Sequence, residues 1–138
     1  KSIALYNFLS AYYALKVGSQ EEFEDPKNVN MKKQIEFAEK CFDLDPLKCD
    51  KSFAIQDYYR MHKNFAKRDL WLKKGSEKAN NGTLSMILGE LIVQGKDGYK
   101  QDKALGMGYM KKGKQQFESK GYTEFSQRAD ILIQAFNE

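Results

Sequence analysis

LGELIVQG, residues 88–95, carries apolar residues at the same positions as IQDYYRMH at 55–62 and LSAYYALK at 9–16. The segments that follow them repeat as well. YMKKG at 109–113, WLKKG at 71–75 and FAEKC at 37–41 each place an aromatic residue four positions before a small one. Residues four positions apart lie on one face of a helix. The sequence therefore predicts a repeated unit of two helices that pack against each other.

Apolar residues recur at spacings of three and four through the rest of the chain, which is the period of a helix. We expect seven helices, at about residues 2–17, 31–43, 48–62, 65–79, 83–94, 102–119 and from 123 onward. Residues 19–27 are expected to form an acidic loop, and Thr83 is expected to cap the fifth helix. The predicted fold is all-α: an α-solenoid of two to three antiparallel helix pairs with a C-terminal capping helix, in one domain over residues 1–138.

Composition narrows the class of protein. Hydrophobic residues make up 41% of the 138 residues and aromatic residues 13%, which indicates a folded domain and not a disordered chain. The net charge is +4, and the lysines are spread along the sequence, which disfavours a dedicated site for a polyanion. No stretch approaches the roughly 20 apolar residues that span a bilayer.

The chain begins at Lys1 and not at a methionine. A cleaved signal peptide, a removed lipoprotein anchor or a longer chain cut at this point would each give such a start.

The unit at 83–118 resembles the Sel-like repeat, a relative of the tetratricopeptide repeat. The residues that carry the resemblance are Leu88, Gly89, Leu91, Ile92, Gly95, Asp102, Gly106, Tyr109 and Gly113. Residues 49–80, with Arg68 where the family has a small residue, and residues 5–42 are more degenerate copies. The resemblance implies two and a half to three repeats. Because its motif consists of packing residues, it concerns the fold and hardly any activity.

Cys41 and Cys49 are separated by seven residues that include Pro46. Secreted members of the Sel-like family carry a similar pair, so the resemblance implies a disulfide and an oxidising compartment, periplasmic or secreted. Cys41 departs from the family pattern, because it lies on the first of two adjacent small positions and not on the second. The alternative is two buried free thiols in a cytoplasmic protein.

The sequence predicts no catalytic residue, no cofactor and no metal ligand. His62 is the only histidine, which leaves no partner for a histidine-based metal site or catalytic dyad, and we expect it on the surface at a helix end. Gly106 and Gly108 lie in a lysine-rich helix without a preceding strand, unlike a nucleotide-binding loop. The acidic residues at 21–25 lack the regular spacing of a calcium loop.

Binding residues are predicted from the repeat geometry. The tyrosine pairs at 12–13 and 58–59 fall mostly on core positions. In stacked helix pairs the first helices line the concave face, so residues between their core positions are expected to meet a partner. These residues are Asp57, Arg60, Met61, Glu90 and Gln94.

The predicted function is a non-enzymatic protein–protein interaction module: a bacterial cell-envelope protein, and in a narrower version an inhibitor or immunity protein against a secreted toxin. One alternative is a cell-wall-associated enzyme or enzyme accessory, which needs a carboxylate or serine in a deep cleft. Another is nucleic-acid binding, which we rank lower. It would use basic residues of the second helices: Lys67, Arg68, Lys73, Lys74, Lys111, Lys112 and Lys114.

Overall fold

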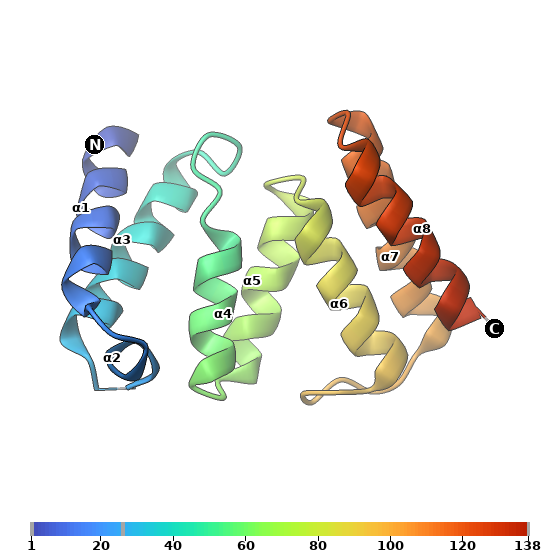
Figure 1. Cartoon of the computed structure of the whole chain (residues 1–138), viewed down its shortest axis with the longest axis horizontal. Coiled ribbons are helices and arrows are strands. Elements are labelled where there is room, and N and C mark those ends of the chain that lie inside the picture. Colours follow the sequence, from blue (N-terminus) through green and yellow to red (C-terminus); the bar gives the residue numbers. More distant parts are fainter. Residues whose placement is uncertain (1, 26, 138) are drawn as a thin grey trace. The chain divides into compact units, whose positions relative to one another are not determined.

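The computed structural model describes residues 2–25 and 27–137, and these residues form eight helices and no strand (Figure 1). The all-α prediction is therefore confirmed. The helices are α1 (Ile3–Val17), α2 (Gln20–Glu24), α3 (Val29–Leu44), α4 (Ser52–Met61), α5 (Phe65–Glu77), α6 (Gly82–Gln94), α7 (Lys103–Ser119) and α8 (Thr123–Asn137).

The extra helix is α2, which lies where an acidic loop was expected. Ser19 caps it: the Ser19 hydroxyl oxygen accepts a hydrogen bond from the Glu22 backbone N–H at 3.1 Å. Serine followed three residues later by glutamate is the capping-box pattern, and Glu21 and Glu22 also lie at the positive end of the helix dipole. The loop prediction was wrong because this short capping signal outweighs the absence of an apolar period.

Two helices begin at other residues than predicted, because side-chain hydrogen bonds determine where they start. Asp45 accepts hydrogen bonds from the N–H groups of Leu47 and Lys48, both at 3.2 Å, which holds a turn where the third predicted helix was to begin. Helix α4 therefore begins at Ser52. Asn81, and not Thr83, caps α6, because its side chain accepts from Leu84 N–H at 3.1 Å.

The chain divides into two compact units, residues 1–71 and 72–138, and the boundary falls inside α5. Each unit is built from helices that run in opposite directions. In the first unit Ser10 of α1 donates to the Gln34 carbonyl of α3 at 3.1 Å, while Ile3 at the start of α1 contacts Cys41 near the end of α3. Contacts that run forward on one helix and backward on the other define an antiparallel pair.

Aromatic rings fill the interface between α1 and α3. The Phe37 ring stacks between Tyr6 and Tyr13, with centroid distances of 6.1 and 5.8 Å. Lys33 lies over the Tyr13 ring at 5.2 Å and Lys40 over the Phe37 ring at 5.5 Å. Stacked rings with cations at their faces add to the burial of apolar area and fix the register of the two helices.

The predicted disulfide is confirmed: Cys41 and Cys49 are joined, with their Cα atoms 5.8 Å apart. Both cysteines are buried, and Phe42 beside them packs edge-on against Trp71 at 5.1 Å. The bond therefore ties the end of α3 to the turn that leads into α4.

Helices α4 and α5 form a second antiparallel contact. Arg68 is only 6% exposed, and its Nε donates to the Gln56 side-chain oxygen at 3.0 Å. A charged guanidinium at this depth is satisfied by polar partners, as burial requires. This pairing accounts for a buried arginine at a position where the predicted repeat has a small residue.

Glycines bring α6 and α7 into close contact in the second unit. A Cβ atom on Gly89 would lie 2.5 Å from the Gly106 carbonyl oxygen, and one on Gly82 would lie 2.8 Å from the Gly113 carbonyl oxygen. As the α6 residue number rises, the α7 number falls, so this pair is antiparallel too. Only glycine allows the two backbones to approach this closely.

A buried polar network reinforces this unit. The Ser85 hydroxyl donates to the Gln116 side-chain oxygen at 2.6 Å, and the Gln116 amide donates to the Ser76 carbonyl at 2.8 Å. These hydrogen bonds tie α5, α6 and α7 together. The predicted antiparallel helix pairs are thus present, while their stacking into a solenoid stays a prediction.

Helix α8 packs on α7. Phe125 stacks on Phe117 at 5.5 Å, and Ala129 and Ile133 are buried with Phe117 in one apolar cluster. Packing on α7 agrees with the predicted C-terminal helix, and it creates the walls of the site described next.

Candidate functional site

An apolar groove lies between α6, α7 and α8. It encloses about 240 Å³. Nine residues of these three helices line it: Thr83, Met86, Ile87, Glu90, Phe117, Phe125, Arg128, Ala129 and Leu132. The helix period explains this set, because positions 83, 86, 87 and 90 share one face of α6, and 125, 128, 129 and 132 share one face of α8.

The walls of the groove are preformed. Phe117 is 8% exposed and Met86 9%, so both are held by the core, whereas Phe125 is 50% exposed at the rim. Because Phe125 stacks on Phe117, its ring is held in place although half of it meets solvent. A rigid aromatic edge beside a packed apolar floor is a typical anchor site for a partner side chain.

Opposite charges flank the apolar floor. Glu90 is half-buried on α6, and Arg128 is on α8, where its guanidinium bonds the Glu124 carboxylate at 2.6 Å and lies 5.9 Å from the Phe125 ring. The Glu124–Arg128 pair is exposed and contributes little to stability. The charges instead give the groove a polarity that a partner can match.

The predicted binding residues lie in different places. Glu90 lines the groove, and Gln94 lies one turn further along α6, half-buried. Asp57, Arg60 and Met61 are on α4, in the unit of residues 1–71, where Arg60 and Asp57 form an ion pair at 2.7 Å. Of the five residues, Glu90 lines the apolar groove described above.

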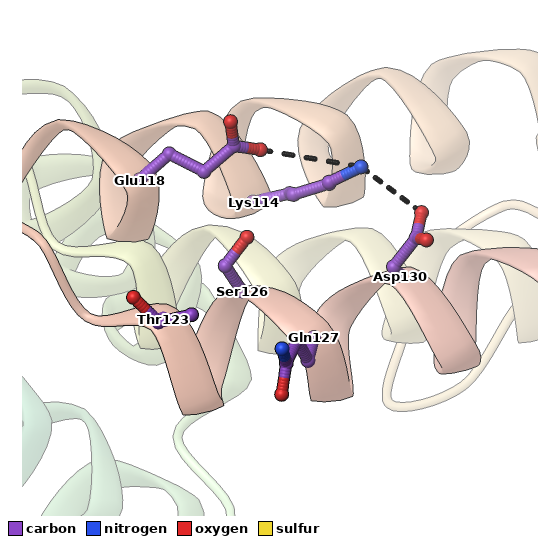
Figure 2. Close-up of a pocket in the computed structure, with 6 residues that line it drawn as sticks. All are labelled: Lys114, Glu118, Thr123, Ser126, Gln127 and Asp130. Carbon is purple, nitrogen blue, oxygen red and sulfur yellow. Dashed lines mark hydrogen bonds and ion pairs between the residues drawn. The ribbon is translucent and has the colours of Figure 1, made fainter.

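A second, polar pocket of about 420 Å³ lies between α7 and α8 (Figure 2). Lys114 of α7 reaches across it to Asp130 of α8 at 3.0 Å, and it also lies 4.0 Å from Glu118, one turn along its own helix. The side chains of Glu118 and Asp130 are 53% and 45% exposed. Half-exposed carboxylates that share one lysine form a surface ion-pair cluster, which lacks the burial that makes a carboxylate a strong proton donor or base.

His62 lies at the C-terminal end of α4, as expected, but it is half-buried and not fully exposed. Its Nδ1–H donates to the Tyr58 carbonyl at 2.7 Å, and its ring lies 4.1 Å from the Tyr58 ring. Among the described residues, no three side chains of histidine, cysteine, aspartate or glutamate come close enough together to hold a metal ion.

Tyr59 of α4 has a structural role, because it connects α4 to α3. Its hydroxyl donates to the Glu39 carboxylate of α3 at 2.9 Å. Burial, and then this hydrogen bond, raise the pKa of Tyr59 far above its usual range. Burial, followed by the charge of Glu36, also raises the pKa of Tyr58. The Tyr59–Glu39 hydrogen bond joins α4 to α3, which agrees with the predicted core position of Tyr59. Tyr12 departs from that prediction, since it is 42% exposed.

The basic residues proposed for nucleic-acid binding do not form one available set. Arg68 is buried against Gln56, Lys114 bonds Asp130, and Lys67 lies over the Tyr59 ring at 5.4 Å. The remaining four, Lys73, Lys74, Lys111 and Lys112, are half-buried or exposed in the unit of residues 72–138.

The α8 side of the groove was missed by the sequence analysis. Phe125, Ala129 and Leu132 lie in the predicted C-terminal capping helix. Their spacing of four and three residues predicts one apolar face. That spacing does not reveal that the face is wide enough to pack on α7 and also border a groove with α6.

Comparisons of this chain with protein-family models, with curated proteins and with solved structures found no match. The resemblance to Sel-like repeats therefore stays a prediction from the quoted motif.

Proposed function

We propose that this chain is a non-enzymatic protein–protein interaction module and that it binds its partner in the groove between α6 and α8. The single observation that supports the proposal most is the groove itself: a preformed apolar floor with Phe125 at its edge and Glu90 and Arg128 on its two sides. Such a site suits one large apolar side chain of a partner with charged neighbours.

The size of the groove favours a protein partner over a small molecule. Sites for cofactors and drug-sized ligands enclose roughly 300–1,000 Å³ and bury most of the ligand. The groove encloses about 240 Å³ and is open to solvent. An anchoring side chain needs less enclosure, because the rest of the partner covers the surrounding surface.

A cell-wall-associated enzyme or enzyme accessory is the alternative from another class. Its best site would be the polar pocket of Lys114, Glu118 and Asp130. The exposure of both carboxylates and their pairing with one lysine make this pocket a weaker candidate than the groove. Substrate turnover that is lost on Glu118→Gln or Asp130→Asn substitution would favour the enzyme.

We also propose a periplasmic or secreted location in a bacterial cell envelope, with inhibition of a secreted toxin as the narrower role. The buried disulfide supports it, since such bonds persist in oxidising compartments. None of the described helices is long and apolar enough to cross a membrane. Alkylation of the protein in intact cells, before and after reduction, would report whether Cys41 and Cys49 are joined in place.

Affinity purification with matched variants tests the binding proposal. Phe125→Ser removes the aromatic edge of the groove, whereas Phe53→Ser alters a phenylalanine of equal exposure, 51% against 50%, on α4. Glu90→Lys and Glu118→Lys reverse a charge in the groove and in the polar pocket, respectively. The proposal expects a partner that is retained by Phe53→Ser and Glu118→Lys and lost from Phe125→Ser and Glu90→Lys. Equal retention by all four variants would contradict it.

A further inference from the structure

The outer face of α1 is apolar along its whole length. Leu5, Phe8, Tyr12 and Leu15 are 45%, 64%, 42% and 84% exposed, and Phe8 stacks on Tyr12 at 6.2 Å. The opposite face of the helix packs against α3. Helix α1 is therefore apolar on two faces, a pattern that a solvent-facing helix does not need.

The spacing of these side chains fits another helix. They follow one another at intervals of three, four and three residues. This is the a and d pattern of a coiled-coil seam, in which each side chain inserts between residues of a facing helix. From Leu5 to Leu15 the face is about 15 Å long at 1.5 Å per residue, on a 15-residue helix of about 22 Å, so it can hold one helix of similar length.

The seam matches itself when a second copy is turned end to end. Leu5 and Leu15 lie five positions before and after Ser10, and Phe8 and Tyr12 lie two positions before and after it. An antiparallel copy would set Leu5 opposite Leu15 of the second copy and Phe8 opposite its Tyr12. A two-fold contact requires this reciprocity, in which each residue meets the same partner from both sides.

Charge does not oppose this contact. Within α1, Ile3–Val17, Ala4, Asn7 and Ala11 are the exposed residues beside the seam, and Lys16 is the one charged side chain. Its ammonium group lies 4.8 Å from the Tyr12 ring of its own helix. In the antiparallel arrangement Lys16 falls beside Ala4 of the second copy, so no two charged side chains of α1 meet.

We propose that two copies of this chain associate through α1, antiparallel, with the seam of Leu5, Phe8, Tyr12 and Leu15 as the contact. One pair of 15-residue helices buries less than a standard interface, so the dimer is weak, with a dissociation constant on the order of 10–100 µM. This surface is separate from the groove, and its test does not depend on the proposed function.

Sedimentation equilibrium of the full chain tests the association. The wild type should show a reversible monomer–dimer equilibrium in this range, and Phe8→Glu should raise the dissociation constant at least tenfold. Phe53→Glu, which alters a phenylalanine exposed to 51%, should dimerise like the wild type. Circular dichroism confirms that the variants fold. A wild type that stays monomeric at millimolar concentration, or a Phe8→Glu variant that dimerises unchanged, would overturn the proposal.

Cysteine cross-linking tests the orientation. In the antiparallel seam the two Ala11 residues flank the two-fold axis, whereas the two Ala4 residues lie about 18 Å apart along the helices. The native cysteines are joined and do not compete. Mild oxidation should therefore cross-link Ala11→Cys and leave Ala4→Cys monomeric on a non-reducing gel. Equal cross-linking of both variants, or of Ala4→Cys alone, would contradict the antiparallel seam.

Discussion

Gly89 and Gly106 face each other across the α6–α7 contact, and a Cβ atom on Gly106 would lie 2.6 Å from the Gly89 carbonyl oxygen. The obstacle is backbone, which cannot swing aside as a side chain can. The packing of α6 on α7 in the second unit therefore depends on these two glycines.

Gly106→Ala is expected to lower the free energy of unfolding by about 1–3 kcal/mol, the usual cost of overpacking. Gly108 is the matched control, two residues along the same helix, because a Cβ atom there meets nothing within 4 Å. Gly108→Ala should raise stability by about 0.5–1 kcal/mol through helix propensity. Urea unfolding of both variants measures the difference, and two variants of equal stability would refute the close contact.

Reduction of the Cys41–Cys49 disulfide is expected to lower the free energy of unfolding by about 2–3 kcal/mol, because the bond closes a short loop and restricts the unfolded chain. Thermal unfolding with and without reductant measures this loss. The double variant Cys41→Ala, Cys49→Ala should show a loss of similar size and no further response to reductant. A wild type that is insensitive to reduction would count against a stabilising bond.

The burial of Tyr59 and its hydrogen bond to Glu39 make stability depend on pH at the alkaline end. The pKa of Tyr59 is raised in the folded state, so its stabilisation is fully present below about pH 10, the ordinary tyrosine pKa, and declines as pH rises above it. Tyr59→Phe should flatten this decline. Denaturant unfolding between pH 8 and 11 measures it, with Tyr122→Phe, at an exposed tyrosine, as the control. Identical pH profiles for the wild type and Tyr59→Phe would contradict the assignment.

Gln116 is the centre of the buried network with Ser76 and Ser85. Gln116→Leu is expected to cost about 1–3 kcal/mol, since it leaves the buried Ser76 carbonyl without its amide donor. Gln115→Leu, on the exposed side of α7, should change stability by less than about 0.5 kcal/mol. Chemical unfolding separates the two. A neutral Gln116→Leu would show that the network does not stabilise the packing.

Much of this fold follows from local sequence signals. The apolar period locates α1 and α3 to α8. The helix expected from about residue 102 begins at Lys103, because Asp102 caps it and accepts a hydrogen bond from Leu105 N–H at 3.0 Å. Capping by Ser19 and Asn81 was missed, because several polar residues precede each helix and the side-chain hydrogen bond selects one of them.

The candidate site was predictable only in part. Glu90 was predicted to meet a partner from the geometry of stacked helix pairs. It lines the groove, while its role in binding stays a prediction. Phe125, Arg128 and Leu132 were not expected there, since their role depends on how α8 packs on α7 and leaves one side of α6 uncovered. That geometry comes from contacts between helices that are distant in sequence.

Site-specific photo-crosslinking tests the central claim, that the groove binds a protein partner. The probe is a benzoylphenylalanine at position 125 or at position 53, two phenylalanines of equal exposure in different units. Irradiation in the native cells is expected to give a discrete protein adduct from position 125 and none from position 53. Equal adducts from both positions, or none from position 125, would contradict it.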